Sequence, residues 1–215
     1  MGIHDLDRRA TSLSESFAME NHTLNLTSAA LLLIDVQQGF DDPRWGIRNN
    51  PHAEHRIAAL LEEWRRLRRP VLHAQHLSLE RQSPLREDAP GHAFKSEALP
   101  MAGEPVFQKH VNSAFIGTHL EDYLRANGID TLVIVGLTTD HCVSTTARMA
   151  ANLGFSGVVV EDATATFDRH GADGAHYSAD MVHRIALASL HGEFATVMDS
   201  QQILGLLQSA SRQSV

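Results

Sequence analysis

The sequence predicts a doubly wound α/β fold, with a six-stranded, mainly parallel sheet and helices on both of its faces. Two observations support this prediction. Short apolar segments alternate about six times with amphipathic segments of helical spacing, a pattern typical of parallel strands joined by helices. The strongest apolar segments are also hydrophobic at consecutive positions, as strands covered on both faces are.

Each element is assigned from its local pattern. We expect strands at residues 29–36, 70–77, 105–110, 130–137, 157–164 and 194–199. We expect helices at residues 53–67, 115–128, 142–155, about 175–191 and 201–208. Gly128 and Gly154 stand at the ends of two of these helices, where glycine commonly terminates a helix.

The remaining segments lack periodicity. Residues 1–28 are polar and are interpreted as an N-terminal arm, followed by a single domain over residues 29–215. Residues 78–104 contain three prolines and two glycines, which predicts a long loop, and loops of this length are often functional.

Composition excludes several classes of protein. A net charge of −8 argues against a nucleic-acid partner, and no apolar run approaches the roughly 20 residues that cross a bilayer. The first residues lack the apolar core of a secretory signal. We therefore expect a cytoplasmic protein without a membrane partner. One cysteine allows neither an intrachain disulfide nor a cysteine-rich zinc site.

Three chemically distinct residues are expected at one edge of the sheet, because ligands bind at the carboxyl ends of parallel strands. Asp35 ends the first strand, Lys109 ends the third, and Cys142 follows the turn after the fourth. A cysteine at a helix start favours the thiolate, a carboxylate can act as its base, and a lysine can support both charges. Each also has an ordinary interpretation: core packing for Cys142, turn capping for Asp35 and surface exposure for Lys109.

Three segments carry a family resemblance. LLLIDVQQGF, FQKHVNSAFIGTHLEDYL and VIVGLTTDHCVSTTARMAANLGF resemble, in order and spacing, the motif blocks of isochorismatase-like cysteine hydrolases, which include nicotinamidases and N-carbamoylsarcosine amidohydrolase. The resemblance implies a catalytic triad of Asp35, Lys109 and Cys142 and a cis peptide at Leu137-Thr138. It also implies an oxyanion hole made by the backbone amides of Thr138 and Cys142, and a homodimer or homotetramer.

The chain departs from two members of that family. Nicotinamidases bind a metal through an Asp-x-His group, whereas this chain has HAQHLSLE there. His73 and His76 would point to opposite faces of a strand, which is poor ligand geometry. We therefore expect no metal and no cofactor. Isochorismatase itself has a residue other than cysteine at the nucleophile position, so Cys142 argues against its vinyl ether hydrolysis.

The acyl pocket is less defined by the sequence. Candidate substrate-binding residues are Phe40, Trp45, Asn112, Phe115 and His141. Aromatic rings would contact an apolar or planar substrate edge, and polar groups would orient it. Packing and loop capping are alternative roles for each. Arg48 is interpreted either as a partner for a substrate carboxylate or as part of a surface ion pair.

These observations predict a cysteine-dependent hydrolase that cleaves the C–N bond of a small amide-like substrate through a thioester, without a metal. One alternative is a metal-using amidase of the nicotinamidase kind, with ligands drawn from His73, His76 and His92. Another is a non-catalytic binding protein that retains the fold. A thiol-redox role is a third, weakened by the absence of a second cysteine.

Overall fold

The protein contains a six-stranded parallel sheet with the strand order β3-β2-β1-β4-β5-β8. The computed structural model describes residue 26 and residues 28–213, so the predicted arm over residues 1–28 lies almost wholly outside the described residues. The strands are β1 (Ala30–Ile34), β2 (Val71–His76), β3 (Val106–Lys109), β4 (Thr131–Leu137), β5 (Ser156–Ala165) and β8 (Thr196–Met198). The predicted fold class is confirmed, and the six strands fall where the apolar segments predict them.

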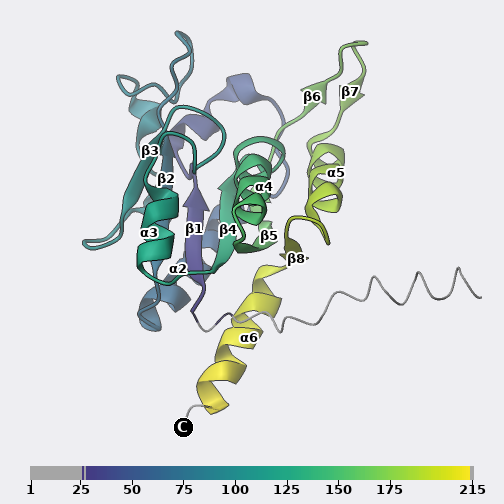
Figure 1. Cartoon of the computed structure of the whole chain (residues 1–215). Coiled ribbons are helices and arrows are strands. Elements are labelled where there is room, and N and C mark those ends of the chain that lie inside the picture. Colours follow the sequence, from purple (N-terminus) through teal and green to yellow (C-terminus); the bar gives the residue numbers. More distant parts are fainter. Residues whose placement is uncertain (1–25, 27, 214–215) are drawn as a thin grey trace, which may run out of the picture.

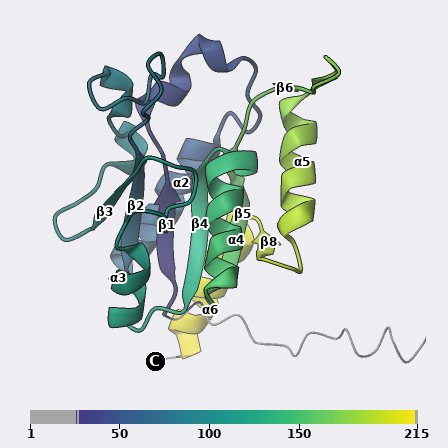
Figure 2. The same ribbon diagram turned by 45° about the horizontal axis from the view of Figure 1, so that its top comes forward.

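Helices cover both faces of this sheet (Figures 1 and 2). The helices are α2 (Ala53–Arg66), α3 (Leu120–Ala126), α4 (Ser144–Asn152), α5 (Ala179–Leu190) and α6 (Ser200–Gln213). Apolar side chains of α3, α4 and α5 pack on one face, and those of α2 and α6 pack on the other. The chain is therefore doubly wound, as predicted.

The hydrophobic pattern of the central strands explains the two cores. In β1, Leu32 and Ile34 belong to the core under α3, α4 and α5, whereas Leu31 and Leu33 belong to the core under α2 and α6. Successive side chains of a strand point to opposite faces, so a strand covered on both sides is apolar throughout. All five residues of β1 are buried for this reason.

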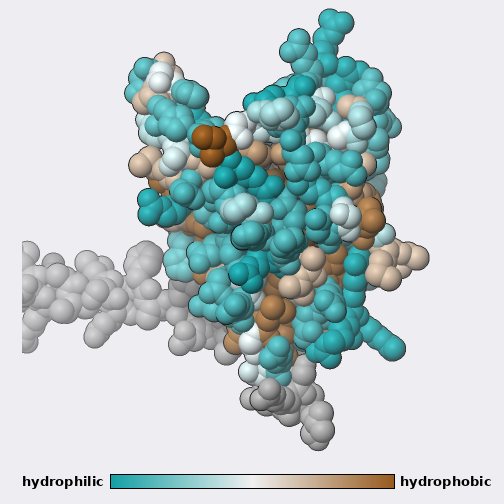
Figure 3. All heavy atoms as spheres, turned by 180° about the vertical axis from the view of Figure 1, so that it is seen from behind, coloured by the Kyte–Doolittle hydropathy of each residue, from teal (hydrophilic) through white to brown (hydrophobic). Residues whose placement is uncertain are grey.

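The surface on the α2 side is mostly hydrophilic (Figure 3). Helix α2 presents charged residues outward and buries Ile57, Leu60, Leu61 and Trp64. The indole N–H of Trp64 donates to the carbonyl of Ala29, 3.0 Å away, which satisfies the one polar group of this buried ring. Within the described residues, no helix is long and apolar enough to cross a membrane.

Helices α3 and α4 begin later than their patterns indicate. Gly117 has a φ of 72°, and the Thr118 hydroxyl accepts from the amide of Leu120, so α3 begins at Leu120 rather than residue 115. Residues Thr139–Val143 form a π-helical turn before α4. Local hydrogen bonding therefore overrides the apolar spacing at both helix starts.

Several short elements were not predicted. Strands β6 (Arg169–His170) and β7 (His176–Tyr177) form an antiparallel hairpin, and four 3-10 turns lie between the major elements: Gln38–Asp41, Pro43–Trp45, Pro90–His92 and Ser96–Ala98. Strands of two residues are too short to show an alternating pattern.

A half-buried ion cluster joins the segment after β1 to α2 and to the long loop. Arg48 donates two hydrogen bonds to Glu54, at 2.7 and 2.6 Å. Lys95, from the loop, lies 2.8 Å from Glu54 and 2.5 Å from Asp41. Burial raises the pKa of Glu54, but the hydrogen bonds from Arg48 and Lys95 outweigh it and lower that pKa from 4.5 to about 2.

Glu54→Gln is expected to reduce the free energy of unfolding at pH 7 by up to about 3 kcal/mol. Because the folded-state pKa of Glu54 is lowered, its contribution is present above pH 4.5 and is lost as the pH falls toward 2. The difference in the free energy of unfolding between the wild type and the variant, measured by urea unfolding, should therefore shrink by more than half between pH 7 and pH 3. A difference in the free energy of unfolding that stays constant over this pH range would contradict the lowered pKa of Glu54.

Candidate active site

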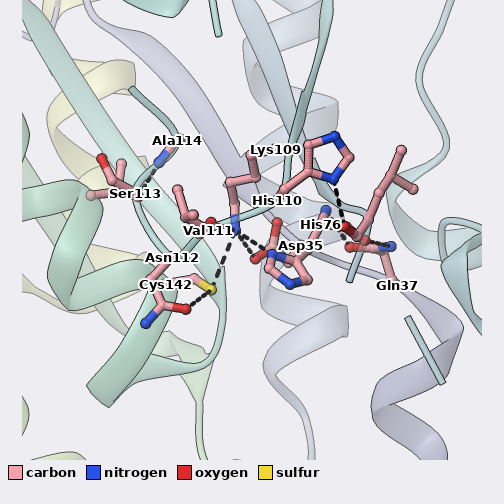
Figure 4. Close-up of polar contacts among 12 residues, drawn as sticks. Asp35, Gln37, His76, Lys109, His110, Val111, Asn112, Ser113, Ala114 and Cys142 are labelled. Carbon is pink, nitrogen blue, oxygen red and sulfur yellow. Dashed lines mark hydrogen bonds and ion pairs between the residues drawn. The ribbon is translucent and has the colours of Figure 1, made fainter. Parts of the chain in front are cut away.

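Lys109, Asp35 and Cys142 meet at the carboxyl edge of the sheet (Figure 4). The ammonium of Lys109 lies 2.6 Å from Asp35 Oδ2 and 3.3 Å from Cys142 Sγ. It also lies 3.2 Å from the carbonyl of Val111 and 3.2 Å from His76 Nδ1. The side chains of Asp35 and Lys109 are both fully buried, so the structure brings together the three residues predicted from the sequence.

Asp35 is positioned directly after β1. Its backbone has a φ of 50°, a conformation that aspartate tolerates better than most residues, and its amide donates to the carbonyl of Ala74. Oδ1 is buried and has no hydrogen-bond partner among the described residues. Asp35 therefore has a free acceptor atom, and its carboxylate lies within 4.8 Å of Cys142 Sγ.

The end of β4 positions Cys142, because the backbone there lies very close to β1. Gly136 has a φ of 117°, and a Cβ at this residue would lie 2.0 Å from the carbonyl oxygen of Ile34, so only glycine fits. The cis peptide expected at Leu137-Thr138 is present. The carbonyl of Thr138 accepts from the amides of His141 and Val143, at 3.1 and 3.2 Å, and Cys142 lies in the resulting π turn.

The electrostatics of Cys142 differ from the sequence-based prediction. Burial and the neighbouring charge of Asp35 raise the pKa of the thiol, and Lys109 only partly opposes them. Burial lowers the pKa of Lys109, but Asp35 and Cys142 outweigh it, so that pKa is raised overall. This direction is opposite to the one expected from the helix start, because burial and the charge of Asp35 outweigh the effect of the helix start on the thiol.

A cavity of about 230 Å³ opens onto Cys142. Of the five candidate substrate-binding residues, four line it: Phe40, Trp45, Asn112 and His141. Asn112 Oδ1 lies 3.7 Å from Cys142 Sγ. Phe115 does not line the cavity. It is buried in the core, where its ring stacks on Phe155 with 5.9 Å between centroids.

Aromatic packing forms one wall of this cavity. The rings of Phe40 and Trp45 lie 5.4 Å apart, and that of Trp45 lies 5.9 Å from Phe167. The indole N–H of Trp45 donates to the carbonyl of Gly39 at 2.8 Å. Leu85, from the long loop, packs in the same cluster. The wall therefore combines the segment after β1 with residues 78–104.

Other lining residues were not among the predicted substrate contacts. They are His76, Ser78, Glu80, Ser83, Leu85 and Arg169. Most of them belong to the long loop after β2, which was predicted from its lack of periodicity. Arg169 carried no signal, since it comes from the β6–β7 hairpin. Its guanidinium donates to Asp140 at 2.9 Å. Arg48 pairs with Glu54 and does not line this cavity.

The site does not fit a divalent metal. Asp35, His76 and Cys142 form the group of potential ligands that the described residues bring within 4.8 Å of one another. Their shared position is occupied by the ammonium of Lys109, which contacts all three. His73 instead contacts Glu104 at 2.9 Å, and His92 contacts the carbonyl of Ala89, so the histidine set of the metal-using alternative is not assembled.

Comparisons with known proteins agree with this architecture. The isochorismatase domain family matches residues 29–202. The chain is 46% identical over 175 residues to the uncharacterized isochorismatase family protein YrdC of Bacillus subtilis (strain 168), covering 81% of this chain and 94% of that protein. It is 30% identical over 191 residues to the maleamate amidohydrolase of Pseudomonas putida, covering 81% and 86% respectively.

A solved structure of an isochorismatase-family protein has the same fold. The crystal structure of an isochorismatase-family protein from Chromobacterium violaceum superposes with a TM-score of 0.83 and 48% identity, covering 86% of this chain and 96% of that chain. The sequence match over most of the chain and the shared fold lead to one conclusion: the chain belongs to the isochorismatase family of hydrolases.

Proposed function

We propose that this protein is a metal-independent amidohydrolase that cleaves the C–N bond of a small amide-like substrate through a thioester on Cys142. The observation that carries the proposal is the contact of one buried ammonium, Lys109 Nζ, with both Asp35 and Cys142. A base, a nucleophile and a supporting cation in mutual contact beside a cavity are the groups that acyl transfer needs.

Acylation begins with proton transfer. The carboxylate of Asp35 takes the proton from the Cys142 thiol, and the resulting thiolate attacks the substrate carbonyl carbon. Lys109 offsets the negative charge that moves from carboxylate to sulfur. As the tetrahedral intermediate collapses, the C–N bond breaks and Asp35 returns its proton to the leaving nitrogen. Ammonia or an amine departs, and the acyl group remains on sulfur.

Deacylation follows the same steps, with water as the nucleophile. Asp35 takes a proton from water as the oxygen attacks the thioester carbonyl. The C–S bond then breaks, the acid is released, and the proton on Asp35 returns to sulfur. The backbone amides of Thr138 and Cys142 are proposed to bind the oxyanion in both halves. In support, both residues line the cavity.

The proposal is tested by measuring ammonia or amine release from a panel of small amides: nicotinamide, carbamoyl compounds, maleamate and aryl amides. We expect at least one to be hydrolysed, with equal rates before and after chelator treatment. Asp35→Asn should abolish the release, since an amide cannot accept the thiol proton. Release that a chelator stops, or that Asp35→Asn leaves intact, would contradict the proposal.

The cavity also favours a substrate that carries a carboxylate. Among the described residues that line the cavity, Arg169 is the one arginine or lysine. Its Nε and Nη2 donate to the carboxylate of Asp140 at 2.9 and 3.3 Å, which orients the guanidinium. Guanidinium groups bind carboxylates with directional, charge-assisted hydrogen bonds. The relative from Pseudomonas putida is named for maleamate, an amide of this class.

Arg169→Gln is accordingly expected to raise KM for a carboxylate-bearing amide by about tenfold, which corresponds to one charge-assisted hydrogen bond. Steady-state kinetics on a matched pair, an acid amide and its methyl ester, provide the measurement. The ester should show little change between wild type and variant. An equal rise in KM for the acid amide and for its methyl ester would contradict a role of Arg169 in carboxylate recognition.

A further inference from the structure

His76 is fixed next to Lys109 by the sheet and by Gln37. It is the last residue of β2 and the register partner of Lys109 in β3, and paired residues of neighbouring strands project from the same face. The side chain of Gln37 donates to the carbonyl of His76 at 3.0 Å and accepts from its amide at 2.8 Å. The backbone of His76 is therefore held on both sides, and His76 lines the cavity. Its contact with Lys109 is drawn in Figure 4.

The contact of this ring with Lys109 defines its tautomer. Nδ1 of His76 lies 3.2 Å from Nζ of Lys109. An ammonium has only donors, so this contact favours the tautomer in which Nδ1 is unprotonated and accepts, with the proton of the neutral ring on Nε2. A protonated ring would place two donors and two positive charges against each other.

The ammonium has more acceptors than hydrogens. Its neighbours are Asp35 Oδ2, the Val111 carbonyl, His76 Nδ1 and Cys142 Sγ, at 2.6, 3.2, 3.2 and 3.3 Å. Three N–H groups cannot satisfy four acceptors with linear bonds. At least one of these contacts is therefore shared, and together they fix Nζ at 3.3 Å from Sγ.

We propose that His76 is a positioning residue: its neutral ring accepts from Lys109 through Nδ1 and keeps the ammonium between Asp35 and Cys142. The role rests on the proposed function, since it acts through Lys109. His76 is thus assigned a task that differs from metal binding, for which the sequence had raised it as a candidate.

The surroundings of the ring support the neutral form. Charged and titratable groups near it come from four segments: Asp35 after β1, Lys109 and His110 at the end of β3, Cys142 in the π turn and Glu80 in the long loop. Burial, and then the charges of Lys109 and His110, lower the pKa of His76, and Asp35 and a backbone hydrogen bond to Val111 only partly offset them. The accepting state is therefore the ordinary state of His76 near neutral pH.

The test uses the alkylation rate of Cys142 by iodoacetamide, which needs no substrate and is unambiguous in a chain with one cysteine. We expect His76→Leu to slow alkylation about tenfold, the effect of losing a hydrogen bond to a charged group. His76→Asn places its carboxamide oxygen near the former Nδ1 and should restore most of the rate. His110→Leu is the matched control, since the His110 ring contacts the carbonyl of Leu77 rather than Lys109.

Lys109→Met separates the two proposals. If His76→Leu alkylates like the wild type while Lys109→Met is slow, the role of His76 is refuted and that of Lys109 stands. If His76→Leu and His76→Asn are equally slow, the hydrogen bond is not the cause and the inference also fails. If neither Lys109→Met nor His76→Leu changes the rate, both the proposed function and the inference are contradicted. Thermal unfolding of each variant verifies that it is folded.

Discussion

Replacing Cys142 by alanine is expected to abolish amide hydrolysis and to leave the fold intact. Removing a covalent nucleophile costs a factor on the order of 10⁴ to 10⁶ in kcat, because the thioester route is lost entirely. The side chain is small, so its loss from the core should lower the melting temperature only slightly. Steady-state ammonia release and thermal unfolding measure both effects.

Two comparisons make the Cys142→Ala result specific. Cys142→Ser should also be strongly impaired, since Asp35 is a weak base for a hydroxyl group. Thr145→Ala, in α4 but outside the lining of the cavity, should retain nearly full activity. Turnover by Cys142→Ala within tenfold of the wild type would be incompatible with covalent catalysis at this residue.

Lys109→Met is expected to lower both stability and activity, because it leaves a fully buried carboxylate on Asp35 without its cation. Removing one partner of a buried pair costs about 3–5 kcal/mol, and the thiolate loses its nearest positive charge. The double variant Asp35→Asn/Lys109→Met should recover much of the stability but none of the activity. Urea unfolding and amide turnover together distinguish the two effects.

An exposed ion pair supplies the control for Lys109→Met. Arg66 contacts Glu63 at 2.6 Å on the surface of α2, where solvent screens the interaction, so Arg66→Met should leave stability nearly unchanged. A Lys109→Met variant as stable as Arg66→Met would show that breaking the buried pair does not cost the expected amount of about 3–5 kcal/mol.

The sequence was sufficient to predict the sheet and the meeting of three side chains. Continuous apolar runs such as the one around β1 identify strands covered on both faces, and the parallel topology then places Asp35, Lys109 and Cys142 at one edge. These inferences depend only on local hydrophobicity and on a general property of parallel sheets.

Features that depend on exact contacts could not be predicted. The direction of the pKa shift of Cys142 reflects burial and the charge of Asp35, which outweigh the helix start. The location of Phe115 in the core depends on where the chain turns before α3. Arg169 reaches the cavity from a hairpin with two-residue strands, which has no detectable periodicity.

Trapping the acyl-enzyme tests covalent catalysis at Cys142 directly. A hydrolysed amide is mixed with the protein, the reaction is quenched with acid within the first turnovers, and the peptide that contains Cys142 is analysed by mass spectrometry. Covalent catalysis at Cys142 predicts that this peptide gains the mass of the substrate's acyl group and loses it on hydroxylamine treatment. Multiple turnovers with an unmodified Cys142 peptide under conditions that preserve thioesters, together with retained activity in Cys142→Ala, would contradict it.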